Sequence, residues 1–578
     1  MNRELRTVWI YYDTETTGVN HPFDQILQIA AVVTSNKWRE FETIDYRCSL
    51  NPDIIPTPEA MLITRQKPAD VTASSRKTQY EMMADYDRFL NQRILSQKDR
   101  GKSINGYDRE RPITFKAHNI QFDDQAYRHN SHITLHNPYI HMMDGCARFD
   151  TMKCAQAISI YAPKAMKFDE TAKGNTSFKL GLLCQANNIT VNESDLHDAL
   201  ADVRYTVKLD EKMAKLAPDI HYQMDLMATK QDVERFTNRN NVFSYSLFHY
   251  GKPKTGFFTA VPNDEDKGRG IGPTEIVWDL SNDPEEFFDK SVEELADHFA
   301  KAKKGNSFKM GSSPTVWFRR NEQPILMPME YVSDDLKSKA GVKEEELERR
   351  ATALKNNKEF VAKLNAAYKQ ATDIEYDQSP FPQEWIYESF PNKGLKEWMT
   401  RFHKSDWNTK KKLVEDFDKR FSKSLDDDPT LIRYKHFATL LILGNAPDFV
   451  IETDDRWKNI KKKVAEKRAA AQLSTTKYIS PGNDKDTFKM TLPYAKLRME
   501  QIRNEIVSPK DEKAEDALKA KYGYDNKKEI LPLIDSWIRW YDHKIIEHQQ
   551  TLGLPVNDNV NSRELKKKMR KAKKLGLG

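Results

Sequence analysis

The chain contains 578 residues, of which 38% are hydrophobic and 31% are charged, so we expect a soluble globular protein. Its length allows up to about four domains. Its longest apolar segment is too short to cross a membrane, and the N-terminal apolar stretch is too short for a secretory signal. The four cysteines form no C-x-x-C pair, which favours reduced thiols in the cytoplasm over a zinc ribbon.

The net charge of +6 is concentrated at the C-terminal end of the chain. Residues 561–578 contain eight Lys or Arg and one Glu, so the rest of the chain is close to neutral. A neutral body does not by itself indicate nucleic-acid binding, and any binding groove must be built from local clusters. We expect the tail to be flexible and to add salt-sensitive affinity.

The first 210 residues alternate between strand and helix patterns. Apolar and β-branched runs predict strands at 6–12, 26–34, 41–48 and 113–117. Helical patterns are expected near 79–95, from 118, near 150–162, near 178–188 and from about 195, with a loop at 97–112. Three antiparallel strands followed by helices and a further strand indicate an α/β domain, to which we assign residues 1–222.

The remaining chain divides into two further regions and the tail. Residues 223–340 contain short apolar runs between turn-like clusters, which predicts a small β-barrel or sandwich with one helix near 292–303. Residues 341–553 are dominated by helix-forming residues and predict a helical domain. Residues 554–578 form the basic tail.

The segment Asp13-Thr14-Glu15 ends the first predicted strand and carries two carboxylates. Because successive strand side chains point to opposite faces, these two carboxylates lie on the same face. Side by side they repel each other unless a cation lies between them. The motif alone is weak evidence, since Asp283-Pro284-Glu285 repeats it within a predicted turn, so further ligands must be found downstream.

Two later acids complete a candidate site. Asp123 follows the strand at 113–117, and Asp202 lies five residues after His197. Because only residues three or four apart lie above one another on a helix, we place His197 in a loop or first turn and Asp202 inside the helix. Asp198 is a competing ligand, and it could equally serve to start the helix.

This set of side chains indicates metal-dependent chemistry. Carboxylate oxygens suit Mg²⁺ or Mn²⁺, whereas Zn²⁺ would call for more His or Cys. Two such ions about 3.5–4 Å apart would clamp the attacking and leaving oxygens of a phosphodiester. His197 is suited to take the proton of the attacking water, because a free imidazole titrates near neutral pH.

The order Asp-x-Glu, Asn-x-x-Phe-Asp and His-x₄-Asp resembles that of the DEDDh 3′–5′ exonucleases. The resemblance implies that four acids bind the metal ions and that His197 is the general base. These acids are Asp13, Glu15, Asp123 and Asp202.

Further segments resemble the bacterial exodeoxyribonuclease I family: Pro58–Thr64, Arg148-Phe149-Asp150, Ser177–Leu180 and His197–Asp202. This resemblance implies a ribonuclease H-like α/β exonuclease domain, an SH3-like β domain and a C-terminal helical domain. It also implies processive, Mg²⁺-dependent 3′–5′ digestion of single-stranded DNA in DNA repair, with release of 5′-mononucleotides.

The same resemblance implies which residues hold the strand. Glu15, Thr16 and Leu62 would meet the terminal nucleotide, and the other family positions are Arg128, Tyr139 and Lys179. Lys179 stands where the family usually has Arg, which keeps the charge but loses the bidentate phosphate contact. Basic clusters at 252–254, 319–320 and 458–468 are further candidates, although a solvated surface also explains them. We expect a monomer, with single-strand binding protein as a possible partner.

Two alternatives use the same residues. An RNA-trimming 3′–5′ exonuclease would share all five catalytic groups, because the choice of sugar depends on the shape of the pocket around the 2′ position. A non-catalytic single-strand-binding repair scaffold is disfavoured because all five groups are present.

Overall fold

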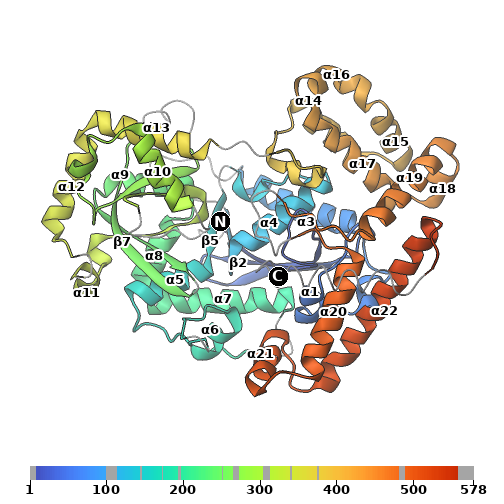
Figure 1. Cartoon of the computed structure of the whole chain (residues 1–578), viewed down its shortest axis with the longest axis horizontal. Helices are drawn as coiled ribbons and strands as arrows, with labels where there is room; N and C mark the ends of the chain where they lie inside the picture. The colour runs from blue at the N-terminus through green and yellow to red at the C-terminus, as the bar shows by residue number, and fades with distance from the viewer. Residues whose placement is uncertain are drawn as a thin grey trace.

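The computed structural model describes residues 8–556 except for 99–112, 144–145, 172–173, 193–196, 250, 264–271, 304–312, 339–340, 374–376 and 481–487. The basic tail from residue 557 and nearly all of the predicted loop at 97–112 lie outside the described residues. Figure 1 shows two β-sheet regions joined side by side, with a large group of helices on the opposite flank.

The first sheet has five strands in the order β3-β2-β1-β4-β5. These strands are β1 (Val8–Thr16), β2 (Ile26–Ser35), β3 (Glu40–Arg47), β4 (Ile113–Ala117) and β5 (Cys146–Asp150). β1, β2 and β3 are antiparallel, whereas β4 and β5 run parallel to β1. The four predicted strands are confirmed. β5 was not predicted, because its five residues contain no β-branched side chain.

Helices cover both faces of this sheet. The described helices of residues 58–239 are α1 (Pro58–Ile63), α2 (Pro68–Val71), α3 (Gln79–Lys98), α4 (Ile120–Ile133), α5 (Thr151–Tyr161), α6 (Leu180–Ala186), α7 (Ala199–Leu216), α8 (Pro218–Leu226) and α9 (Lys230–Arg239). Of these, α9 packs with the second sheet, and α1 and α2 pack with the C-terminal helices. On one face Ile10 and Tyr12 of β1 pack with α3 and α4 residues such as Tyr86 and Tyr127. On the other face Tyr11 packs with residues of α7. The predicted start of the last helix near 195 lies outside the described residues.

The second sheet is antiparallel, with the strand order β10-β6-β7-β8-β9. Its strands are β6 (Phe243–His249), β7 (Lys252–Ala260), β8 (Thr274–Asp279), β9 (Thr315–Arg319) and β10 (Ile325–Pro328). The predicted helix at 292–303 is α10 (Val292–Lys303), which is followed by α11 (Asp334–Ser338), α12 (Glu344–Asn356) and α13 (Lys358–Thr372). α12 and α13 share a hydrophobic core with β8 and α10, so they pack on the second sheet. The domain boundaries themselves stay a prediction.

The C-terminal helices form two groups, both packed on the first domain (Figure 1). The first group is α14 (Lys393–Lys404), α15 (Trp407–Glu415), α16 (Phe417–Asp427), α17 (Ile432–Asn445), α18 (Asp448–Glu452) and α19 (Asp455–Gln472). Its core takes in Tyr80 and Leu135 of the first domain. The second group is α20 (Leu492–Val507), α21 (Glu512–Tyr522) and α22 (Lys527–Thr551). Its core takes in Leu27, Met61 and Leu62.

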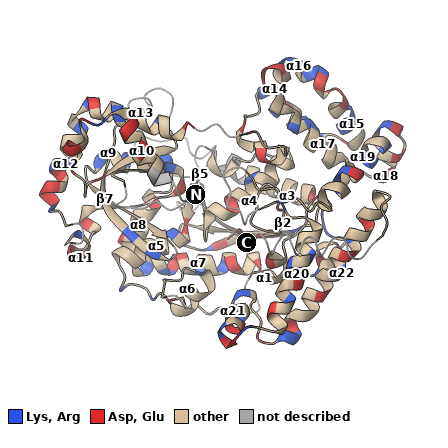
Figure 2. Ribbon diagram, viewed as in Figure 1, with Lys and Arg blue, Asp and Glu red and all other residues tan. Residues whose placement is uncertain are grey.

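Charged residues are mixed over the described surface. Figure 2 shows Lys and Arg interspersed with Asp and Glu along the helices of all three regions. Among the described helices, none combines the length and apolar character needed to cross a membrane.

Candidate active site

The end of β1 presents Asp13 and Glu15 toward α7. Because side chains alternate along the strand, both acids share the face of Tyr11, which packs against Ala199 and Val203 of α7. The pairing of β1 with β2 shifts register between Glu15 and Thr16, so the regular strand ends at the acids. Glu15 is buried, with 7% of its surface exposed.

The turn before α7 supplies the histidine and the third acid. His197 lies in this turn with a φ of 66°, and Asp202 lies in the first turn of α7, as we predicted. Asp198 is the N-cap of the helix and accepts a hydrogen bond from the backbone N–H of Ala201 at 3.3 Å. Its carboxylate is also paired with Arg47, so Asp198 starts and anchors the helix.

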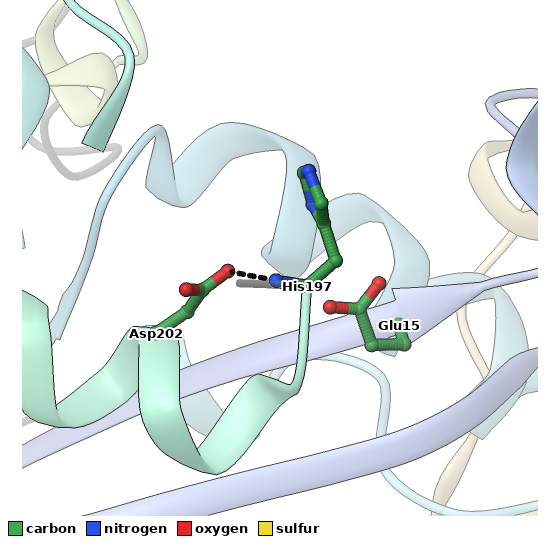
Figure 3. Close-up of side chains that lie close together, drawn as sticks. All are labelled: Glu15, His197 and Asp202. Carbon is green, nitrogen blue, oxygen red and sulfur yellow. Dashed lines mark hydrogen bonds between the residues drawn. The ribbon is translucent and has the colours of Figure 1, made fainter. Parts of the chain in front are cut away.

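Glu15, His197 and Asp202 come together although they lie far apart in the sequence. One potential ligand atom from each lies within 4.8 Å of the others. Figure 3 shows the carboxylates of Glu15 and Asp202 pointing toward one another, with the imidazole of His197 above them. The backbone N–H of His197 donates a hydrogen bond to Asp202 Oδ2 at 3.3 Å, which fixes the turn against the helix.

Asp123 is held beside β1 by Thr14. Its Oδ1 accepts hydrogen bonds from the backbone N–H of Thr14 at 3.0 Å and from the Thr14 hydroxyl at 2.7 Å. Since Thr14 lies between Asp13 and Glu15, this contact brings the fourth acid to the same strand end. Asp123 is 3% exposed and lies in the first turn of α4.

The acids of this cluster are costly to ionise without a cation. Burial raises the pKa of Asp123 to about 8 and that of Asp202 to about 7. Burial and the charges of the neighbouring acids also raise the pKa values of Asp13 and Glu15 well above their usual range. Carboxylate oxygens that repel one another in a buried site fit a hard divalent cation such as Mg²⁺.

The residues predicted to hold a nucleic-acid strand lie on several different elements. Lys179 is exposed at the N-terminus of α6, and its positive charge lowers the pKa of His197, after the larger effect of burial. Leu62 is fully buried in the core that α1 shares with α20 and α22. The Thr16 hydroxyl donates to the backbone oxygen of Gly18 at 2.7 Å, which shapes the turn after β1.

Arg128 and Tyr139 lie beside residues 386–390, which follow the second domain. Arg128 Nη1 donates to the Tyr387 hydroxyl at 3.5 Å, and the Tyr139 hydroxyl donates to the backbone oxygen of Ile386 at 3.4 Å. The rings of Tyr139 and Phe390 are 5.5 Å apart. Tyr387 and Phe390 are 56% and 66% exposed, so they form an open aromatic surface next to Arg128.

The buried contacts of Asp124, the residue after Asp123, were not predicted from the sequence. Asp124 is buried and paired with Arg148 of β5, and it accepts hydrogen bonds from the Tyr12 hydroxyl at 2.6 Å and from His141 Nδ1 at 2.9 Å. Burial alone would raise its pKa, but Arg148 and His141 hold it below the usual range. The sequence does contain two consecutive acids, Asp123 and Asp124. Because adjacent side chains on a helix point in different directions, one of them must point away from the site into the domain.

Two family models match the sequence. Residues 10–102 match the exonuclease domain, and residues 272–370 match the exonuclease I SH3-like domain. The chain therefore carries an exonuclease domain and an exonuclease I SH3-like domain. The predicted resemblance and the predicted fold class are confirmed. The sequence matches no curated protein.

Solved structures of exonuclease I share the fold of this chain. That of the moderately thermophilic exonuclease I from Methylocaldum szegediense is 18% identical with a TM-score of 0.66, covering 93% of this chain and 99% of that one. E. coli exonuclease I in complex with a dA16 oligonucleotide is 16% identical with a TM-score of 0.63, covering 91% and 100%. A structure of SSB/exonuclease I with the inhibitor CFAM is 16% identical with a TM-score of 0.62, covering 93% and 100%.

Proposed function

We propose that this nuclease degrades single-stranded DNA from its 3′ end by metal-dependent hydrolysis and releases 5′-mononucleotides processively. The observation that carries the proposal is the meeting of Glu15, His197 and Asp202, with Asp123 fixed to the same strand end through Thr14. Acids from three separate segments share one site, which is the arrangement that phosphodiester hydrolysis with divalent cations requires. The dA16 oligonucleotide bound to E. coli exonuclease I supports the choice of substrate.

The four acids Asp13, Glu15, Asp123 and Asp202 would hold two Mg²⁺ ions, for which Mn²⁺ can substitute. Bound there, the ions would stabilise the charge on the attacking and leaving oxygens. The imidazole of His197 accepts the proton of the attacking water and must be neutral to do so. Burial and the charges of Lys179 and Arg65 lower its pKa, which keeps the imidazole neutral at physiological pH.

The rest of the strand would be held by stacking and by cations. Tyr387 and Phe390 offer exposed aromatic faces for bases, and Arg128 places a cation beside them for a phosphate. Arg128 lies five residues after Asp123 on α4, a rise of about 7.5 Å. We expect this aromatic surface to hold nucleotides upstream of the bond that is cut.

Two further expectations belong to this proposal. Single-strand binding protein is a partner, in line with the SSB/exonuclease I structure among the relatives. A cytoplasmic location and a monomeric state stay predictions.

The test uses DNA strands labelled separately at the 5′ and 3′ ends, with an RNA strand of equal sequence. We expect Mg²⁺-dependent loss of the 3′ label first, mononucleotide products, and little loss of RNA. Asp123→Ala should abolish cleavage and leave strand binding largely intact. Loss of the 5′ label first would refute the polarity, faster loss of RNA would refute the substrate, and unchanged cleavage by Asp123→Ala would refute the site.

A further inference from the structure

Lys179, one of the residues predicted to hold the strand, follows a loop that folds back on itself. In this loop the backbone N–H of Ser177 donates to the backbone oxygen of Asp169 at 2.8 Å, and that of Thr171 donates to the backbone oxygen of Asn175 at 2.7 Å. Lys179 is exposed at the start of α6 and does not cap the helix with its side chain. Within the described part of the chain, no carboxylate forms an ion pair with Lys179, so its charge is open to an anion.

The first domain holds one side of this loop through His118, the residue after β4. His118 Nε2 donates to the backbone oxygen of Phe178 at 2.7 Å, and its Nδ1 lies 3.0 Å from the Thr151 hydroxyl of α5. His118 comes immediately before the N-cap of α4, whose first turn carries Asp123. The residue that precedes Lys179 is therefore fixed beside the start of a helix that contributes an acid to the candidate site.

The second domain holds the other side of the loop through the end of the β6–β7 pair. The ring of Phe248 in β6 packs edge-on against the ring of Phe178, with centroids 4.8 Å apart. Gly251, between β6 and β7, has a φ of 74° and lies against the backbone of Thr176. A Cβ added to Gly251 would lie 2.6 Å from the backbone oxygen of Thr176, so only glycine permits this approach.

The loop is thus fixed between two domains, while the side chain at its end faces solvent. A cation that is already in place loses less conformational freedom when it binds a ligand than one on an unsupported loop. We propose that Phe248 and Gly251 are positioning residues that hold Lys179 where it binds a phosphate of the single strand. This proposal rests on the proposed function and deepens it, because it makes the second domain contribute to strand affinity through a residue of the first domain.

The test compares two glycines that have the same backbone conformation. Gly251→Ala introduces a Cβ that must displace the backbone of Thr176. Gly341→Ala is the matched control: its φ is 67°, and its added Cβ would meet no atom within 4 Å. Phe248→Ala removes the ring contact without a change at Gly251, and Lys179→Ala removes the cation itself. Thermal unfolding confirms that each variant is folded.

The first readout is the affinity for a fluorescent dT oligonucleotide, measured by anisotropy in EDTA over a range of salt concentrations. Losing one phosphate contact should lower the salt dependence, the slope of log K against log[salt], by about 0.7. We expect Lys179→Ala to show this decrease and to bind about tenfold more weakly. Gly251→Ala and Phe248→Ala should change both quantities in the same direction, with about threefold weaker binding, whereas Gly341→Ala should change neither.

The double variant shows whether Gly251 acts through Lys179. Adding Gly251→Ala to Lys179→Ala should cause no further loss of affinity, because both changes remove the same phosphate contact. A full further loss in the double variant would overturn the proposal. An unchanged affinity and salt dependence of both Gly251→Ala and Phe248→Ala would overturn it as well.

The second readout is hydrogen exchange of the backbone amide of Ser177, which needs no DNA. We expect faster exchange in Gly251→Ala than in the wild type and in Gly341→Ala, because the displaced loop loses the hydrogen bond to Asp169. Unchanged exchange would refute the positioning role, whatever the protein does to DNA. A wild-type protein that binds no single strand would instead refute the proposed function and the ligand assigned to Lys179, while the exchange result still decides whether the second domain holds the loop.

Discussion

Binding of divalent metal to the site should release protons. The number of protons released depends on the raised pKa values of the acids in the site. With pKa values of about 8 and about 7, Asp123 and Asp202 are both partly protonated at pH 7 in the metal-free protein. The protonated fractions are about 0.9 and about 0.5, so binding at pH 7 should release about 1.4 protons from these two groups. At pH 8.5 the same two groups should release about 0.3 proton. Asp13 and Glu15 add to both values, because their pKa values are also raised.

The assay is calorimetric titration with Mn²⁺ in two buffers that have different ionisation enthalpies. The difference between the two observed enthalpies gives the number of protons released, and the experiment is repeated at pH 7 and pH 8.5. Asp123→Asn keeps an oxygen to accept from Thr14 but cannot ionise. Its residual binding should release about 0.9 proton fewer at pH 7.

The sign of the effect follows from the direction of the shifts. Acids with raised pKa values in the folded protein contribute stability below their unfolded pKa values of about 3.9, and this is lost as the pH rises toward 8. The affinity for metal should therefore increase between pH 6 and pH 8, while the metal-free protein loses stability. Identical enthalpies in the two buffers at pH 7 would mean that no protons are released on metal binding. This result would refute the raised pKa values of these acids.

Three more outcomes are expected. His197→Ala should lower kcat by about 10²–10⁴-fold, because the water loses its general base. Lys116→Met should lower the free energy of unfolding by about 3–5 kcal/mol, because Lys116 Nζ lies 2.7 Å from Asp210 Oδ2 and both side chains are fully buried. Phe390→Ala should weaken single-strand binding about tenfold in a binding assay, whereas Phe449→Ala, at an equally exposed ring, should not.

Each of these outcomes has a control. Lys215→Met removes an exposed ion pair with Glu211 and should cost less than about 1 kcal/mol; an equal cost for both lysine variants would contradict the role of burial. His197→Ala should still bind DNA, and a kcat close to that of the wild type would exclude His197 as the base. Equal strand affinity of the two phenylalanine variants would exclude the aromatic surface at residues 387–390.

Much of the first domain could be predicted because its strands and helices have clear apolar periods. The positions of His197 before the helix and Asp202 within it followed from the spacing of five residues. β5 was missed because Cys-Ala-Arg-Phe-Asp is buried by its neighbours rather than marked by its own pattern. The role of Asp198 stayed open in the sequence because its contact with Arg47 of β3 exists only once α7 has packed on the sheet.

Contacts between distant segments were beyond sequence reasoning. Arg65 and Gly523 are separated by 458 positions, and no local pattern marks either residue as a partner of the other. Leu62 was expected near a terminal base, and its complete burial depends on helices that begin more than 400 residues later. Periodicity indicates which residue faces a core, but it does not indicate which other helix or strand packs against that residue.

The shared core of α1, α20 and α22 has a consequence for synthesis of the protein. The ribosome makes residues 56–67 more than 400 residues before the helices α20 and α22 that pack on them. Until then Met61 and Leu62 have no apolar partners from α20 and α22. The hydrogen bond between Arg65 and the backbone oxygen of Gly523 also cannot form before that point. We therefore expect α1 to gain its final packing only after α22 has been synthesised.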